Sequence, residues 1–209
     1  MTTVLELTVS ADVAAWRAAG FLVDANGECV LGDIRVRLDP VGRAGGITAW
    51  VLGDAPDPTI TDIDGLLTSH GSVDAVDLDP ALRQPNGVTS IDHVVVNTPD
   101  LERTCAALKA ATTAPLKRIR EAGAMRQGFH RLGSLIVEVV THPGVIGDHA
   151  SFWGLALNAD DLEAMYTSLG DDVLSAPKDA VQSGRRIASF RREAGLGLPV
   201  AVMTPHVRR

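Results

Sequence analysis

Two titratable side chains lie inside apolar runs of strand length, where a charge is costly, and they are the first candidates for chemistry. His93 lies in the run Ile91-Asp92-His93-Val94-Val95-Val96, and Glu138 lies in Leu135-Ile136-Val137-Glu138-Val139-Val140. A carboxylate in such a strand must be paired, hydrogen-bonded or bound to a metal. In catalysis, Glu138 would be the base that moves a proton beside a carbonyl group, and His93 would orient or polarise the oxygen. The alternative is a buried, hydrogen-bonded pair without chemistry.

Aromatic and basic residues in the second half of the chain are candidates for substrate binding. Strict strand alternation places Phe152 on the face of Gly154 and Phe190 on the face of Arg186, so both rings could line a cavity. The planar guanidinium of Arg186 suits a carboxylate or a phosphate. An arginine on an edge strand can instead serve only to prevent pairing with another chain.

The other histidines carry less information. His130 lies in a strand of the same segment as the glutamate and could reach the same site. His142, His149 and His206 fall in turns or near the C-terminus, where solvated histidines are the ordinary case. Among these three, His149 is the best substitute metal ligand, because it directly precedes the strand that begins near Phe152.

An internal repeat defines the elements that must position these residues. The segment Ile91 to Glu102 aligns without a gap on Phe152 to Glu163, and each segment is typical of a strand followed by a helix with an Asp N-cap. Leu135 to Thr141 likewise matches Leu198 to Thr204, and both are typical of a final strand. Between the helix and the final strand, each copy has a β-like stretch that begins with arginine. The repeat unit is therefore predicted to be a βαβββ module.

The repeat divides the chain into two predicted domains. These are residues 1–86 and 87–209, and the second domain holds two modules, 87–145 and 150–206. The N-terminal domain resembles a third, degenerate βαβββ module followed by a linker, Asp54 to Gly87, with a helical turn near Ile63 to Leu67. The predicted fold class is α+β.

The run Ile91 to Val96, followed by Asp100-Leu101-Glu102 and later by the strand Leu135 to Val140, resembles the vicinal oxygen chelate superfamily. This superfamily includes glyoxalase I, the bleomycin-resistance proteins and the extradiol dioxygenases. The resemblance implies paired modules that form a curled, mixed-sheet cup around a small molecule. In metal-dependent members each module contributes one ligand from its first strand and one from its last, which implies His93 and Glu138 as ligands.

The second module departs from that ligand pattern. By the repeat, Gly154 corresponds to His93 and Ala201 corresponds to Glu138, and neither residue has a side chain that can bind a metal. We therefore expect no tightly held four-ligand metal, and a divalent metal could bind only weakly at such an incomplete site.

Three functions remain open from the sequence. The leading prediction is a cup that binds a small metabolite, either anionic or carbonyl-bearing. The alternative is a metal-dependent enzyme that uses His93 and Glu138, either a lyase or isomerase working through an enediolate, or a dioxygenase. The third is a vestigial cup that serves as an interaction module, because this fold hosts both enzymes and binding proteins.

Composition and charge exclude other classes. The formal net charge of −7 and the lack of a long Lys/Arg cluster argue against a nucleic-acid partner. No apolar run approaches the ~18 residues of a membrane span, and no secretory signal is visible. Cys29 and Cys105 have neither metal-binding nor CxxC spacing, so we expect reduced thiols in a cytoplasmic protein.

The odd number of modules raises the question of what covers the N-terminal sheet. The candidates are the neighbouring cup, the segment Asp54 to Gly87, or the same module of a second chain. Because a twofold pairing of identical modules would resemble the cup, we expect a homodimer through strands between Val4 and Gly53.

Overall fold

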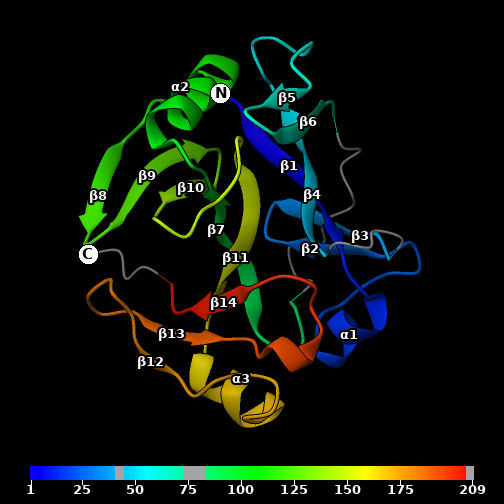
Figure 1. Ribbon diagram of the computed structural model, residues 1–209. Coiled ribbons are helices and arrows are strands. Elements are labelled where there is room, and N and C mark those ends of the chain that lie inside the picture. The colour runs from blue at the N-terminus through cyan, green and yellow to red at the C-terminus, as the bar shows by residue number, and fades with distance from the viewer. Residues whose placement is uncertain (41–44, 73–82, 206–209) are drawn as a thin grey trace.

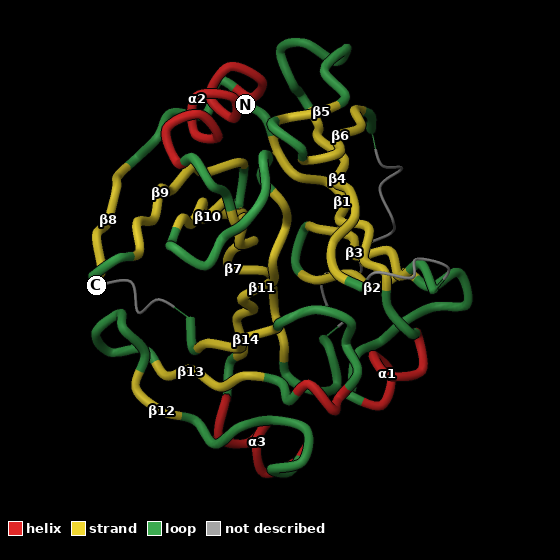
Figure 2. The backbone as a smooth tube through the Cα atoms, in the orientation of Figure 1, coloured by secondary structure: helices red, strands yellow, loops and turns green. Residues whose placement is uncertain are grey.

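The computed structural model describes residues 1–40, 45–72 and 83–205, which form two twisted sheets that pack against each other (Figure 1, Figure 2). The larger sheet has eight strands in the order β12-β13-β14-β11-β7-β10-β9-β8. The smaller sheet has six, in the order β2-β3-β1-β4-β6-β5. Figure 1 shows the larger sheet curving from β8 round to β12, with β7 and β11 at the centre of the curve.

The larger sheet consists of two βαβββ modules. The first module is β7 (Val88–Asn97), α2 (Leu101–Thr112), β8 (Arg118–Ala122), β9 (Met125–Leu132) and β10 (Leu135–Thr141). The second is β11 (Ser151–Ala159), α3 (Leu162–Leu169), β12 (Lys178–Asp179), β13 (Arg186–Ser189) and β14 (Val200–Met203), with a short 3-10 helix, Arg192–Ala194, before β14. The α+β class and the curled, mixed sheet of paired modules are confirmed.

Both module helices begin at the predicted acidic residue. The Asp100 side chain accepts a hydrogen bond from the backbone N of Arg103 at 2.9 Å, and the Asp161 side chain accepts one from Ala164 at 2.9 Å. Such a cap satisfies an amide that has no partner within the first helical turn and is worth about 1 kcal/mol. The helices therefore start at equivalent points of the repeat for the same physical reason.

The antiparallel strands β7 and β11 relate the two modules by a pseudo-twofold axis. His93 pairs with Ala156, and Val95 pairs with Gly154. Exchanging the two strands exchanges these two pairs, so Gly154 occupies in β11 the position that His93 occupies in β7. The structure therefore has the register that the sequence repeat predicts.

Each central strand also carries a β-bulge at the same point of the repeat. On β7 the extra residue is Asp92, between Ile91 and His93, and on β11 it is Trp153. A bulge inserts one residue and shifts the alternation of side chains by one. Strict alternation therefore fails across both residues.

The smaller sheet repeats the plan of the larger one in reduced form. Its elements are β1 (Thr3–Ser10), α1 (Val13–Ala18), β2 (Glu28–Leu31), β3 (Ile34–Leu38), β4 (Gly46–Gly53), β5 (Asp62–Ile63) and β6 (Leu66–His70). β1 runs parallel to β3 and antiparallel to β4, as β7 does to β10 and β11. β6 runs parallel to β4, as β14 does to β11. Strands β4 to β6 thus resemble a second reduced module, which the sequence interpretation treated as a last strand plus linker.

The helical turn predicted near Ile63 to Leu67 is wrong, because these residues form the hairpin of β5 and β6. Its turn residues Asp64 and Gly65 both have positive φ angles, 53° and 97°. An Asp-Gly turn of this kind matches the twist of two antiparallel strands. The Asp64-Gly65 dipeptide is therefore a better indicator of the local structure than the Pro- and Gly-rich composition around it.

The two sheets share one continuous cluster of buried apolar residues. Trp50 of β4 meets Phe152 of β11 edge to face, with ring centroids 5.2 Å apart. Trp16 of α1 donates a hydrogen bond from Nε1 to the backbone O of Leu196 at 3.1 Å. The cup of the same chain therefore covers the inner face of the N-terminal sheet, which was one of the three predicted possibilities.

Within the described ranges, no helix is both long and apolar enough to cross a membrane.

The two cysteines, Cys29 and Cys105, are free thiols. Both are buried, which raises their pKa to about 12 and about 11. Since the thiolate is the reactive form, neither cysteine is a nucleophile at neutral pH.

Candidate functional site

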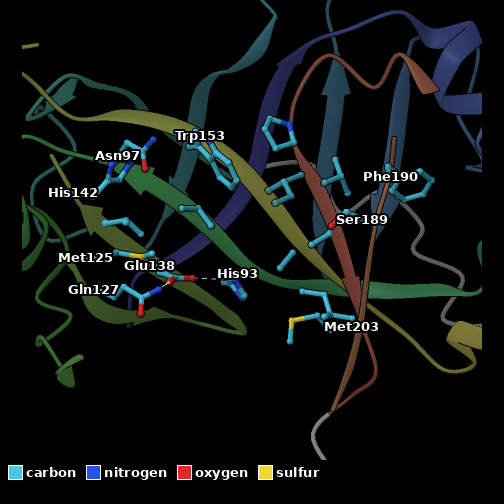
Figure 3. Close-up of a pocket in the computed structure, with 18 residues that line it drawn as sticks. His93, Asn97, Met125, Gln127, Glu138, His142, Trp153, Ser189, Phe190 and Met203 are labelled. Atoms are coloured by element: carbon cyan, nitrogen blue, oxygen red, sulfur yellow. Dashed lines mark hydrogen bonds and ion pairs between the residues drawn. The ribbon is translucent and has the colours of Figure 1, made fainter. Parts of the chain in front are cut away.

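A cavity of about 500 Å³ lies inside the curve of the larger sheet (Figure 3). Along β7, His93, Val95 and Asn97 line this cavity, whereas Val94 and Val96 are fully buried in the core. The apolar lining consists of Val95, Met125, Val140, Trp153, Leu155, Ala156, Ile187, Phe190, Pro199, Val200, Ala201 and Met203. The polar lining consists of His93, Asn97, Gln127, Glu138, His142 and Ser189.

His93 and Glu138 point into this one cavity and contact each other, as the strand alternation predicted. His93 Nε2 lies 3.1 Å from Glu138 Oε2, and the two side chains are only 13% and 11% exposed. Parallel pairing of β7 with β10 brings them together, because Glu138 lies beside Val95, the next residue on the face of His93. Figure 3 shows the pair on adjacent strands at the cavity wall.

Asp92 holds the other side of the imidazole. Its Oδ2 lies 2.9 Å from His93 Nδ1. Neighbouring residues on a regular strand point to opposite faces, and the bulge at Asp92 allows this contact. Burial by itself lowers the pKa of His93, but the hydrogen bonds and charges of Asp92 and Glu138 outweigh it and raise that pKa to about 9. The ring is therefore an imidazolium at neutral pH.

Arg185 of the second module contacts Asp92, the residue that orients His93 in the first module. Its guanidinium lies 3.3 Å from Asp92 Oδ1 and donates to Asn158 Oδ1 at 2.9 Å and to the backbone O of Thr204 at 2.6 Å. Burial tends to raise the pKa of Asp92, but the His93 hydrogen bond and the Arg185 charge hold it well below its usual range. The result is an alternating chain of charges that runs from Arg185 to Glu138.

Hydrogen bonds also determine which polar groups remain for a ligand. Gln127 donates from Nε2 to Glu138 Oε1, so both oxygens of Glu138 have partners. The side chains of Asn97 and Ser189 line the cavity and have no hydrogen-bond partner within the described residues. These two neutral groups are therefore available to a bound molecule.

Of the four residues predicted to bind a substrate, Phe190 lines the cavity and Phe152 does not. Phe152 packs on Trp50 of the other sheet, which corrects the expectation that it would face the cup. The bulge at Trp153 is the physical reason, because it turns Phe152 to the core side and leaves Trp153 at the cavity.

Arg186 and His130 also lie outside the cavity, which corrects two further predictions. Arg186 points to the side of α3, where its Nη2 lies 3.1 Å from Glu163 Oε1. His130 is buried beneath α2 with its Nδ1 3.0 Å from the backbone O of Ala114, and burial lowers its pKa. Both residues occupy the face of their strand opposite to the cavity.

Of the remaining candidate histidines, one lines the cavity and another lies away from it. His142 lines the cavity, and its Nδ1 accepts a hydrogen bond from the backbone N of Gly144 at 3.1 Å. His149 lies instead 3.8 Å from Asp64 in the β5–β6 turn, away from the cavity lining. His206 falls outside the described residues.

Sequence reasoning missed several cavity residues and their supports, namely Asp92, Gln127, Trp153 and Arg185. An acidic residue directly before His93 was the one available signal, because a carboxylate commonly orients a functional imidazole. The contact of Arg185 could not be inferred, since it joins residues of different modules across the pseudo-twofold axis.

Solved structures of similar fold were found, although no family model and no curated protein sequence matches the chain. A mutant of 4-hydroxymandelate synthase from Streptomyces coelicolor is similar with a TM-score of 0.68 at 14% identity, over 99% of this chain and 93% of that chain. A xylose isomerase-like TIM barrel/4-hydroxyphenylpyruvate dioxygenase fusion protein gives 0.65 at 12%, over 99% and 50%. Methylmalonyl-CoA epimerase from Mycobacterium tuberculosis gives 0.51 at 15%, over 61% and 95%. The chain has the vicinal oxygen chelate fold.

Within this vicinal oxygen chelate cup, the second module has no counterpart of the polar pair. Ala201 lies beside Ala156 just as Glu138 lies beside Val95, so Ala201 holds the position of the glutamate. At Gly154, the position of the histidine, an added Cβ would lie 2.5 Å from the backbone O of Pro199. That half of the cup is therefore closed to any side chain at the histidine position.

The residues present do not fit a resident metal ion in this vicinal oxygen chelate cup. Within the described residues, no group of three or more His, Cys, Asp and Glu side chains has an arrangement that could hold one. Both ring nitrogens of His93 lie against carboxylates, so neither is directed at an open coordination position. The geometry instead provides a hydrogen-bonded ionic group at the wall of an apolar cavity.

Proposed function

We propose that the protein binds a small molecule in the cup, with the ligand's polar group placed against His93 and Glu138. The observation that carries this proposal is the cavity of about 500 Å³ whose largely apolar wall contains that ionic pair. A concave, mostly apolar site with a few convergent polar groups is the usual form of a small-molecule site.

The balance of polar and apolar lining supports binding as the leading function. The apolar wall gives affinity through burial, while the few polar groups orient the ligand. The cavity is also large enough for a ligand, which weighs against a vestigial cup that acts only as an interaction module.

A metal-free enzyme is the second candidate, favoured by one observation. Asp92, His93 and Glu138 form a continuous hydrogen-bonded chain that could orient a proton donor or acceptor at a bound carbonyl compound. The alternative of a metal-dependent lyase, isomerase or dioxygenase is compatible with the fold of the similar structures. It requires metal ligands that the second module does not supply.

Trp153 offers a direct test of binding. Of the three tryptophans, Trp16 and Trp50 are fully buried, whereas Trp153 lines the cup and is 50% exposed. Titration with a library of small carbonyl compounds and alcohols should change the intrinsic fluorescence, and Trp153→Phe should abolish that change. Glu138→Ala should weaken the alcohols, which can donate a hydrogen bond to this carboxylate, by about tenfold or more, since a charged hydrogen-bonding group is worth ~1.5–3 kcal/mol.

The outcomes separate the candidates. If no compound binds, or if the binding of alcohols is unaffected by Glu138→Ala, the proposed site is wrong. Turnover of a bound compound by the metal-free protein would favour the proton-transfer enzyme. Turnover that appears only when a divalent metal is added would favour the metal-dependent alternative.

Homodimer formation and a cytoplasmic location stay separate proposals. The buried free thiols Cys29 and Cys105 support a reducing compartment. The case for a homodimer through strands between Val4 and Gly53 now rests on the outer face of that sheet alone, because the cup covers the inner face. Light scattering at micromolar concentration tests it, and a monomeric mass would refute it.

A further inference from the structure

The polar lining of the cup contains one carboxylate and two histidines. Glu138 is the one carboxylate among the cavity-lining residues, and no described residue of the lining is a lysine or an arginine. His93 does not change this balance, because its two ring nitrogens lie against the carboxylates of Asp92 and Glu138. A ligand carboxylate placed at this wall would meet the negative charge of Glu138, and the positive charge of His93 beside it is already shared between two carboxylates.

Arg186, which the sequence suggested for an anion, and two nearby arginines of the second module are engaged elsewhere. The three pairs lie outside the cavity lining and join Arg185 to Asp92, Arg186 to Glu163 and Arg191 to Asp171. Their charges are therefore committed to carboxylates of the protein itself.

Arg192 borders a different hollow. This hollow has a volume of about 550 Å³ and is lined by the loop between β13 and β14, including Arg191 and Arg192. Phe190 and Pro199 line both hollows and stand between them. On this side the cup is thus bounded by an aromatic ring and a pyrrolidine ring, and Arg192 lies in the hollow beyond them.

We propose that the cup selects uncharged ligands, namely aryl or alkyl ketones, aldehydes and alcohols, and rejects the corresponding carboxylates. The inference rests on the proposed binding function and names the ligand class of the same site. It replaces the anionic option of the sequence analysis, whose support was Arg186. Entry into an apolar cavity strips water from an anion, and an anion without a partner there loses far more free energy than a neutral oxygen does.

The free polar groups suit such ligands. A ketone or aldehyde oxygen can accept a hydrogen bond from the amide of Asn97 or the hydroxyl of Ser189. An alcohol can also donate to Glu138. These partners are neutral or negative, so they discriminate by charge as well as by shape.

Two matched pairs of probes test the selectivity. Benzylacetone and hydrocinnamate share a phenylethyl arm and differ in a methyl ketone against a carboxylate. Octanol and octanoate share a heptyl arm and differ in a hydroxymethyl group against a carboxylate. Dissociation constants at pH 7 from Trp153 fluorescence and ligand-detected NMR should favour the neutral member of each pair by at least about tenfold, or ~1.4 kcal/mol.

The variant Glu138→Gln removes the charge and keeps the shape. It should reduce the neutral-to-anionic preference to about threefold or less, chiefly by improving carboxylate binding. Glu102→Gln is the matched control, because Glu102 lies on α2, is 65% exposed and pairs with Arg126 outside the cup. The preference should be unchanged in that variant.

The failure of this inference is distinguishable from the failure of the binding function. Equal or tighter binding of the carboxylates in the wild type overturns the uncharged-ligand class while leaving the cup a binding site. Carboxylate binding that Arg192→Ala abolishes also overturns it and assigns the anion to the neighbouring hollow. Absence of binding by all four probes and by the wider carbonyl and alcohol library overturns the binding function itself.

Discussion

The two modules of the cup have the same backbone plan and opposite chemistry. Strand pairing places Asp92, His93 and Glu138 of the first module at the positions of Trp153, Gly154 and Ala201 in the second. The first module therefore contributes the polar wall, and the second contributes an apolar wall from the same kind of strands. The comparison teaches that this fold fixes positions, while the residues at them decide what the site does.

The largest expected effect comes from the one side chain that joins the modules through charge. Arg185→Ala removes one of the two cations that contact the buried carboxylate of Asp92, and it also removes the donor to Asn158 and Thr204. Breaking a buried ion pair in this way typically costs about 3–5 kcal/mol of unfolding free energy. Denaturant unfolding measures it. The neighbouring Arg186→Ala is the matched control, because its pair with Glu163 is exposed and should contribute at most about 1 kcal/mol. Equal losses of unfolding free energy in the two variants would contradict the assigned role of Arg185 as the charged link between the modules.

The second-largest expected effect is a pH dependence of the unfolding free energy that arises from His93 of the first module. His93 has a pKa raised to about 9 in the folded state, so between pH ~6.5 and 9 the folded protein binds more protons than the unfolded chain. The unfolding free energy should be at its full value below the unfolded pKa and fall by up to a few kcal/mol as pH rises towards 9.

A variant and a second histidine control for this pH effect. His93→Gln should flatten the decline above pH ~6.5. The lowered pKa of His130 has the opposite sign, because the unfolded state then takes up a proton first, and stability falls as pH drops below ~6.5. That acidic limb should persist in His93→Gln. A pH profile that does not change in this variant would contradict the assigned role of the imidazolium.

A smaller effect should mark the closed half of the cup. Gly154→Ala forces a Cβ against the backbone O of Pro199, 2.5 Å away, and overpacking of this kind costs roughly 1–3 kcal/mol. Gly71→Ala is the control, since no atom of the described residues lies within 4 Å of a Cβ added there. Thermal unfolding compares them, and a Gly154→Ala variant as stable as the control would show that this strand pair can move apart.

Sequence reasoning succeeded where the physical signal is local or repeated. The Asp N-caps at Asp100 and Asp161, the order of strands in each module and the shared face of His93 and Glu138 all follow from spacing along one strand or helix. It failed at Phe152 because alternation assumes a regular strand, and the bulge at Trp153 is set by pairing with β7.

The amino-acid sequence by itself determined the repeat, the α+β modules and the absence of metal-binding side chains at Gly154 and Ala201. Only the tertiary structure decided which residues share the cavity, because bulges and contacts across the pseudo-twofold axis bring Asp92 and Arg185 to His93 and turn Phe152 away. Local patterns record periodicity along one chain segment, whereas a binding site depends on how separate strands pair and curve.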